Sequence, residues 1–234
     1  GGVVLDLSSL RQLLWTRPGV VRAQAGIRLG ELDRQTQAQG WEMRCLPSTF
    51  RSATLGGLFG GGFGGVGSIN HGPLASPGNV LGVRAITLEP EPRALELRAP
   101  EALLLHHVYG TNGVVLELEV ALAPAHPWLE AIASFDDFEA ALAFADTLAQ
   151  APGIVKKSVT LLAQPVPDLL LEATPWLAGH LQPGTHAVLM LVAEWAEAAL
   201  LQLVQDRGGR LTMNRSAAEV RQSNRTIVES TWNH

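Results

Sequence analysis

The 234-residue sequence contains one cysteine, Cys45, so it cannot form an intrachain disulfide. Such scarcity fits a reducing compartment, and we expect a cytoplasmic protein. The longest wholly apolar run, residues 187–193, is much shorter than the ~20 residues that a membrane-spanning helix needs, so no integral membrane segment is expected. The first residues show no basic stretch of the kind that opens a secretory signal peptide, and none is expected.

Charged residues make up only 17% of the chain, and the formal net charge is −5. Nucleic-acid-binding surfaces are normally basic, so no nucleic-acid partner is expected. His106 and His107 are adjacent, and on a helix their side chains would point about 100° apart, which does not suit one metal ion. No cluster of Cys, Asp or Glu lies beside them, so we expect no metal site. Hydrophobic residues, at 47%, suffice for the cores of one large or two modest domains.

Glycine is concentrated between Pro47 and Gly72, where it occupies nine of 26 positions. Each glycine in a regular element costs roughly 0.5–1 kcal/mol relative to alanine, so such a run indicates tight turns or close approach to a ligand. One alternative is a flexible linker, but the glycines are interleaved with Leu55, Leu58 and Phe59, which favour burial. We therefore predict an ordered loop whose backbone N–H groups form a nest for an anion.

Neither common phosphate motif is present: the chain has no G-x-x-x-x-G-K-[ST], and no usable GxGxxG follows a strand. The spacing instead resembles the second phosphate loop of the FAD-binding fold shared by vanillyl-alcohol oxidase and p-cresol methylhydroxylase (PCMH). The nearest branch is the 2-hydroxy-acid dehydrogenases, such as the flavin subunit of glycolate oxidase and D-lactate dehydrogenase. That branch reads P-S-S, four residues, S/T-I-G-G, six residues, G-G, five residues, Y-G. The same intervals here separate Pro47-Ser48-Thr49, Thr54-Leu55-Gly56-Gly57, Gly64-Gly65 and His71-Gly72. This sequence departs from the family at His71, where tyrosine is usual. It also departs at Gly60, Gly62 and Phe63, where the family tends to have alanine, asparagine and alanine.

Other segments extend the resemblance. Residues 2–8 and 22–27 are similar to a strand pair of the family, and Asn79-Val80-Leu81 to its Asn-Val-Leu. Residues 110–117 resemble its G-S/T-x-G-V-V-T-E segment, whose backbone contacts the nucleotide. In that family a small subdomain with a first phosphate loop precedes the segment that residues 2–8 resemble. Because it is missing here, we expect either a truncated chain or a half-site.

The resemblance implies FAD as cofactor. Its diphosphate would be held by backbone N–H groups of Gly56, Gly57, Gly64 and Gly65 and by the Thr54 hydroxyl. Val114 and Val115 would hold the nucleotide through main-chain contacts. The full set of implied cofactor-binding residues is Pro47, Ser48, Thr49, Thr54, Leu55, Gly56, Gly57, Gly64, Gly65, Ser68, His71, Gly72, Asn79, Gly110, Gly113, Val114 and Val115. His71 either faces the flavin or only fills the place of the tyrosine in the fold.

The predicted fold is α+β, with an FAD-binding PCMH-type domain over residues 1–124, lacking its N-terminal subdomain, and a second domain over residues 125–234. In the first domain we predict strands at 3–6, 20–25, 81–88, 94–97 and 114–122, and a helix at 29–39 that is anchored by Leu32 and closed by Gly40. In the second we predict strands at 128–134, 154–162, 186–193 and 210–213. One helix of this domain is predicted to begin at Asp136, and two others are predicted at 195–206 and 217–228. This β-α-β-β-α-β order is ferredoxin-like, and in the flavoprotein family it forms the substrate (cap) domain.

If flavin is present, its N5 accepts a hydride, and the protein must supply a base for the hydroxyl proton and a cation for the substrate carboxylate. Arg221 and Arg225 are one turn apart on the predicted helix, and Arg225 is the better match to the carboxylate-pairing arginine of the family. The alternative is two solvated surface arginines. His234 is a candidate base, the alternative being a frayed terminus.

The sequence therefore predicts an FAD-dependent oxidoreductase acting on the CH–OH group of a small 2-hydroxy acid by hydride transfer to flavin N5. The alternative is a non-catalytic scaffold subunit of a multi-subunit flavin oxidase. Expected partners are a small-molecule substrate and either a partner subunit of an oxidase complex or further copies of the chain.

Overall fold

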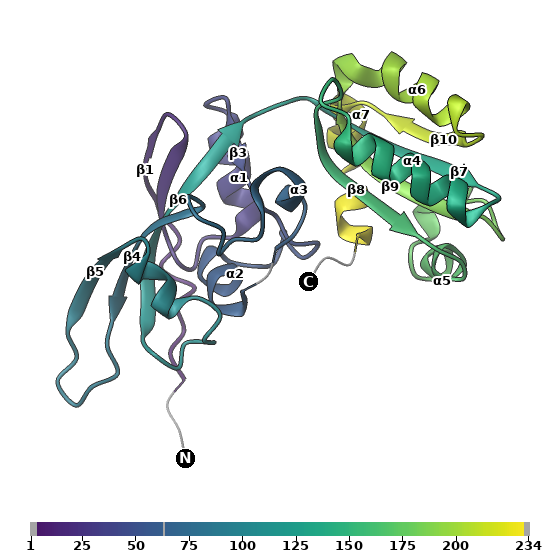
Figure 1. The fold of residues 1–234 in the computed structure, drawn as a ribbon. Coiled ribbons are helices and arrows are strands. Elements are labelled where there is room, and N and C mark those ends of the chain that lie inside the picture. The colour runs from purple at the N-terminus through teal and green to yellow at the C-terminus, as the bar shows by residue number, and fades with distance from the viewer. Residues whose placement is uncertain (1–3, 63, 232–234) are drawn as a thin grey trace. The chain divides into compact units, whose positions relative to one another are not determined.

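The computed structural model describes residues 4–62 and 64–231 (Figure 1). Phe63, His234 and the first residue of the predicted strand at 3–6 lie outside the described residues. The chain divides into two compact units between Ala125 and His126, one residue beyond the predicted boundary. Within 4–62 and 64–231, no helix is both long enough and apolar enough to cross a membrane.

Unit 1 is built around a six-stranded antiparallel sheet. Its strands are β1 (Leu13–Arg17), β2 (Val20–Gln24), β3 (Trp41–Met43), β4 (Val80–Ile86), β5 (Ala94–Arg98) and β6 (Val114–Pro124). The strand order is β1-β2-β6-β4-β5, and β3 pairs with the far end of β6. Its helices are α1 (Leu29–Gln37), α2 (Leu55–Gly61) and the one-turn α3 (Ser68–His71), and a 3₁₀ turn covers Glu101–Leu105.

The core of unit 1 forms where α1 and α2 pack on one face of this sheet. Leu32 of α1 and Phe59 of α2 are completely buried, together with Val21 of β2 and Leu118 of β6. Leu32 is the helix anchor that the sequence predicts. Gly40, with φ +82°, follows α1 and lets the chain turn into β3.

The first strand is the main correction in unit 1. Residues 4–6, predicted as part of a strand, form none, and the first strand is instead β1. β1 turns through Pro18 and Gly19, which has φ +75°, and pairs with β2 in an antiparallel hairpin. The β-branched content of the opening residues indicated a strand, but in this fold they have no neighbouring strand to pair with.

Charged side chains on the outer face of this sheet form a network across several strands. Arg22 of β2 donates to Glu117 of β6 at 2.8 Å and to both carboxylate oxygens of Glu96 of β5 at 2.7 and 2.9 Å. Glu96 is three strands away, because β6 and β4 lie between β2 and β5. The bond from Arg22 lowers the pKa of Glu96.

A glycine makes the second long link of this network possible. Arg98 of β5 donates to both oxygens of Glu119 of β6, at 2.6 and 2.8 Å, and its side chain crosses β4 at Gly82. A Cβ at Gly82 would lie 2.6 Å from Arg98 Nη1, so any larger residue would displace the guanidinium.

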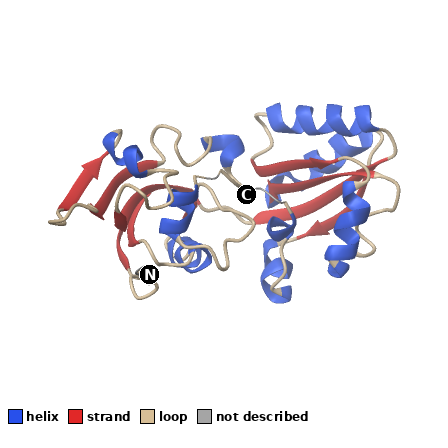
Figure 2. Ribbon diagram, turned by 90° about the horizontal axis from the view of Figure 1, so that it is seen from below, coloured by secondary structure: helices blue, strands red, loops and turns tan. Residues whose placement is uncertain are grey.

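Unit 2 has a four-stranded antiparallel sheet covered by helices on both faces (Figure 2). Its strands are β7 (Trp128–Phe135), β8 (Lys156–Leu162), β9 (His186–Ala193) and β10 (Arg210–Arg215). Its helices are α4 (Phe138–Gln150), α5 (Val166–Ala173), α6 (Glu197–Asp206) and α7 (Ala217–Ser223), with 3₁₀ turns at Pro175–Leu177, Glu194–Ala196 and Ile227–Ser230. The strand order β10-β7-β9-β8 and the β-α-β-β-α-β sequence confirm the predicted ferredoxin-like fold.

Two helix ends in unit 2 differ from the prediction. The N-cap of α4 is Asp137, whose carboxylate accepts the N–H of Ala140 at 2.8 Å, whereas Asp136 pairs with Arg210 at 2.7 Å. The helix predicted over 217–228 ends at Ser223, because Asn224 adopts φ +53°, which asparagine tolerates better than most residues. Arg225 therefore lies beyond the helix, and the prediction that it shares a helix face with Arg221 is wrong.

Glu130 anchors the segment that follows α7 to the sheet. This buried β7 carboxylate accepts hydrogen bonds from the Thr226 hydroxyl and, at 3.1 Å, from the N–H of Ile227. The Arg215 guanidinium lies 3.7 Å away and also stacks over Trp176. Burial raises the pKa of Glu130 above its ordinary value, although these bonds partly oppose the shift.

We predict that Glu130→Gln changes how the stability of unit 2 depends on pH. The unfolded chain releases this proton near pH 4.5 and the native state only at a higher pH, so the native state binds more protons in between. The stability that protonated Glu130 contributes to the native state is fully present at low pH and is lost as the pH rises through the native pKa of Glu130. The free energy of unfolding of the native chain minus that of the variant should therefore fall as the pH is raised from about 4.5.

Urea denaturation over a pH series measures this difference, and Glu139→Gln, on the exposed side of α4, is the matched control. Parallel stability curves for the native chain and Glu130→Gln would contradict the assignment.

Candidate functional site

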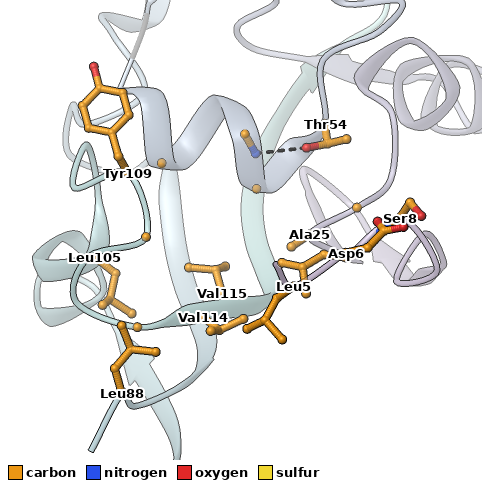
Figure 3. Close-up of a pocket in the computed structure, with 17 residues that line it drawn as sticks. Leu5, Asp6, Ser8, Ala25, Thr54, Leu88, Leu105, Tyr109, Val114 and Val115 are labelled. Carbon is orange, nitrogen blue, oxygen red and sulfur yellow. Dashed lines mark hydrogen bonds between the residues drawn. The ribbon is translucent and has the colours of Figure 1, made fainter. Parts of the chain in front are cut away.

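Unit 1 contains a cavity of about 700 Å³ between α2 and the start of β6 (Figure 3). Segments far apart in the sequence form its walls: the stretch before β1, the end of β2, the glycine face of α2, and the loop that enters β6. Its lining residues are Leu5, Asp6, Leu7, Ser8, Ala25, Gly26, Thr54, Gly56, Gly57, Gly60, Leu88, Leu105, Tyr109, Gly110, Gly113, Val114 and Val115.

The cavity brings together two groups of predicted cofactor-binding residues. One group comes from the glycine-rich stretch and the other from the loop and strand some fifty residues later; they are Thr54, Gly56, Gly57, Gly110, Gly113, Val114 and Val115. The backbone joins the two segments directly, because the N–H groups of His107 and Tyr109 donate to the carbonyls of Phe59 and Gly60, each at 3.1 Å.

The structure describes the glycine-rich stretch except at Phe63, and the helix α2 lies within it. Thr54 is the N-cap of α2, and its hydroxyl accepts the N–H of Gly57 at 3.1 Å. The N–H of Gly56 donates to Ala25 O at 2.7 Å, and that of Leu55 to Ile27 O at 2.9 Å. The nest predicted for a diphosphate is therefore not present at Gly56 and Gly57, whose N–H groups bind protein acceptors. The carbonyls of Ala25 and Ile27, just after β2, accept the N–H groups of Gly56 and Leu55, and the sequence did not place this segment beside α2.

The glycines of α2 serve two different purposes. A Cβ at Gly56 would lie 2.8 Å from Ala25 Cβ, so glycine is needed for α2 to rest on the end of β2. A Cβ at Gly60 would meet no atom within 4 Å, because this position faces open space in the cavity wall. The absent side chains thus expose the backbone of α2 as a smooth wall of the cavity.

A second set of predicted cofactor residues lies outside this cavity lining: Pro47, Ser48, Thr49, Leu55, Gly64, Gly65, Ser68, His71, Gly72 and Asn79. The contacts described for this set are internal to the protein. Asn79 Nδ2 donates to the carbonyls of His71 and Pro73, both at 2.9 Å, and its Oδ1 accepts from Arg44 at 3.2 Å. Gly65, with φ +131°, lies against the Leu46 carbonyl. A direct role for this set in cofactor binding remains a prediction.

Of the two candidate catalytic residues, the structure describes only Arg225. Arg225 is an exposed residue of unit 2, and its N–H donates to Ser223 Oγ at 3.3 Å. His234 lies outside the described residues. Between 4 and 231, apart from residue 63, no group of three or more His, Cys, Asp or Glu side chains is placed to hold a metal ion.

Sequence reasoning missed several residues of the cavity. Asp6 and Ser8 form one side of it, and the carboxylate of Asp6 accepts the N–H of Ser8 at 2.8 Å, which lowers the pKa of Asp6. Leu88 and Leu105 add apolar surface, and Tyr109 lies immediately before the G-T-N-G segment that carried part of the resemblance. Among the described residues of the lining, Asp6 is the only acid and none is arginine or lysine. The cavity therefore offers apolar surface and hydroxyl groups rather than positive charge.

The loop that precedes β6 has a strained backbone beside the cavity. His107 and Tyr109 have φ of +55° and +51°, a conformation that costs residues other than glycine of order 1–3 kcal/mol each. Their side chains meet, with His107 Nε2 3.2 Å from the Tyr109 hydroxyl. Gly62 makes room for this arrangement, because a Cβ there would lie 2.2 Å from His107 Cγ.

Comparison with known proteins shows that unit 1 is similar to FAD-binding domains. Residues 1–91 match the family model described as "FAD binding domain". No curated protein sequence matches the chain. Among solved structures, alkyldihydroxyacetonephosphate synthase is similar in two crystal forms. One gives a TM-score of 0.70 at 14% identity over 97% of this chain, the other 0.69 at 15% over 89%. The chain spans 44% of the length of either synthase chain.

The fold prediction is confirmed: unit 1 has the architecture of an FAD-binding domain of the PCMH type, and the chain as a whole combines helix and sheet as expected. FAD is the cofactor of this domain. The low identity to the synthase establishes similarity of fold alone.

We predict that Gly60→Leu weakens FAD binding without unfolding the chain. The new side chain would extend into open space in the cavity wall, and leucine is a better helix former than glycine by about 0.8–1 kcal/mol. Thermal melting should therefore show equal or greater stability, while flavin fluorescence should show weaker FAD binding than in the unmodified chain.

Gly60→Ala should weaken FAD binding less than Gly60→Leu, because it adds only one carbon atom. Gly56→Ala should instead destabilise the chain, because its methyl group would collide with Ala25 and lower the melting temperature. If Gly60→Leu bound FAD as tightly as the unmodified chain, the cavity would not be the cofactor site.

Proposed function

We propose that the chain is part of an FAD-dependent oxidoreductase that oxidises the CH–OH group of a small 2-hydroxy acid. The observation that carries this proposal is the cavity itself, where the side-chain-free face of α2 lies across from Val114 and Val115 within a domain that matches an FAD-binding family. The match supports the cofactor, and we infer the 2-hydroxy acid from the resemblance of the glycine-rich spacing to that of glycolate oxidase and D-lactate dehydrogenase.

The residues of the cavity fit a dinucleotide with planar rings. Val114, Val115 and Leu105 provide an apolar floor for a ring, and Gly57 and Gly60 leave the opposite wall free of side chains (Figure 3). Hydroxyl groups of Thr54 and Ser8 lie on the same lining and suit ribose or phosphate oxygens. A volume of about 700 Å³ lies within the usual range of ligand pockets.

When bound, the flavin supplies the acceptor for two electrons from the substrate. In this proposal the chain's own residues bind and orient the partners of the reaction. The apolar residues of the floor would exclude water from a ring bound there, and the main chain at Val114 and Val115 would hold the nucleotide. Arg225 of unit 2 binds the substrate carboxylate, since its exposed guanidinium is a suitable donor for two oxygens.

A second candidate is a scaffold subunit that retains the fold without turnover. One observation favours this scaffold: the described residues of the cavity lining include no arginine or lysine to balance the charge of a diphosphate. In that case the partner would be a flavin-bearing subunit of the same complex. The similar solved structure is named a synthase, so the fold by itself does not select oxidation of a hydroxy acid.

The decisive experiment is a visible spectrum of the purified protein, expressed from the complete gene, before and after addition of glycolate or lactate. Bound flavin that bleaches on addition of the acid under anaerobic conditions supports the enzyme. Flavin that does not bleach with any 2-hydroxy acid contradicts the proposed substrate. A colourless protein that copurifies with a flavin-bearing subunit would establish the scaffold alternative instead.

We predict that Arg225→Ala raises the KM for the hydroxy acid at least tenfold while leaving FAD affinity unchanged, because a charge-assisted hydrogen bond contributes about 1.5–3 kcal/mol. Arg221→Ala is the matched control, since Arg221 lies in α7 and is also exposed. Steady-state kinetics with an uncharged alcohol should show no such difference between Arg225→Ala and the unmodified enzyme. Equal effects of the two variants would remove Arg225 from the site.

A further inference from the structure

Tyr109 is placed unusually for a tyrosine. It is the only tyrosine in the sequence, and 71% of it is exposed. It lies at the rim of the cavity beside the last turn of α2, with its ring directed away from the apolar floor (Figure 3). Tyrosine usually buries most of its ring, so an open aromatic face at the edge of a cavity is available to a ligand.

The backbone at Tyr109 does not favour this residue. Its φ of +51° suits glycine, and Gly110, with φ +76°, follows directly. Hydrogen bonds from the N–H groups of residues 107 and 109 to the carbonyls of Phe59 and Gly60 fix the turn, and these bonds would form with any side chain at 109 except proline. A glycine would therefore make the same turn without strain. Non-glycine residues in this conformation concentrate at ligand-binding sites, where the side chain is needed.

His107 fixes where the ring of Tyr109 points. Its Nε2 lies 3.2 Å from the phenol oxygen, and the two rings are tilted with centroids 5.4 Å apart. The imidazole is itself held on its other side, by an edge contact to His106 at 6.1 Å and by the bare Cα of Gly62. His106 in turn makes an edge contact with Phe59 of α2 at 5.4 Å. A row of rings thus links the core to the phenol at the cavity rim.

We propose that Tyr109 stacks against one of the two ring systems of the bound FAD and that His107 acts as its positioning residue. The inference rests on the FAD-binding role proposed above and adds a specificity-determining residue to it. The shared chemistry is a planar heteroaromatic ring, which both adenine and isoalloxazine supply. The exposed ring of Tyr109 can offer stacking at this rim, where the described lining residues include no arginine or lysine for an ionic contact.

Fluorine NMR tests the contact directly. Because the sequence has one tyrosine, labelling with 3-fluorotyrosine gives a single resonance that reports on Tyr109 alone. FAD should shift this resonance through the ring current, and one of the two half-molecules, ADP or FMN, should reproduce the shift. A shift with ADP identifies adenine as the stacked ring, and a shift with FMN identifies isoalloxazine.

Failure of this inference and failure of the proposed function give different results. If flavin fluorescence shows that FAD binds while the resonance of Tyr109 does not move, the stacking contact is refuted and the cofactor site survives. If FAD does not bind at all to the purified protein from which flavin has been removed, both the stacking contact and the proposed cofactor site are refuted.

Substitutions provide the second test. Tyr109→Ala should weaken FAD binding about tenfold or more, the usual effect of removing an aromatic ring from a base, whereas Tyr109→Phe should stay within a few fold. Both variants keep a residue other than glycine at φ +51°, so the strain of the turn is preserved. Leu104→Ala is the control, since Leu104 is 69% exposed, lies in the preceding 3₁₀ turn and does not line the cavity.

His107→Ala should reduce the ligand-induced shift of the Tyr109 resonance without abolishing FAD binding, because the ring remains but is no longer oriented. Equal FAD affinities for Tyr109→Ala and Leu104→Ala, with both variants folded by circular dichroism, would overturn the proposal.

Discussion

Unit 1 depends on the direct contact between α2 and the end of β2. The N–H of Gly56 donates to Ala25 O, and the two backbones approach so closely that one methyl group at position 56 would collide with Ala25. This contact fixes the height of α2 above the sheet. It therefore sets the distance from Gly60 to Val114 and Val115, and with it the space available for a planar ring. The carbonyls of Phe59 and Gly60 then orient the loop that enters β6.

The glycine-rich stretch shows how one composition can serve several purposes. In α2 its glycines allow close packing at Gly56 and an open wall at Gly60, while Gly62 admits the imidazole of His107. The expectation of a nest of free N–H groups overlooked the demand that backbone donors be satisfied within the fold. Thr54 and Ala25 meet that demand, so what α2 presents to a ligand is shape rather than donors.

Much of the architecture was accessible from the sequence, for reasons that are local. The strand predicted at 186–193, which contains the apolar run 187–193, is β9, and a central strand of this kind is buried on both faces. The family resemblance implied that the glycine-rich stretch and Val114-Val115 share one site, and residues of both segments line the cavity. The errors arose where a neighbour in space decides the outcome. Residues 4–6 have strand-forming residues but no strand partner, and α7 stops at Asn224, where Ser223 and Glu130 capture the chain that follows.

The charged network on the outer face of the sheet of unit 1 acts as a register lock. Arg22, Arg84 and Arg98 face Glu96, Glu117 and Glu119, so positive and negative charges balance across strands β2, β6, β4 and β5. If one strand slipped by a single residue, its charged side chains would turn toward the apolar core and their partners would be left unpaired. Because Arg22 and Glu96 are separated by two intervening strands, the penalty would extend over the width of the sheet. The alignment of β6, and hence the position of Val114 at its start, is therefore held from the side opposite to the cavity.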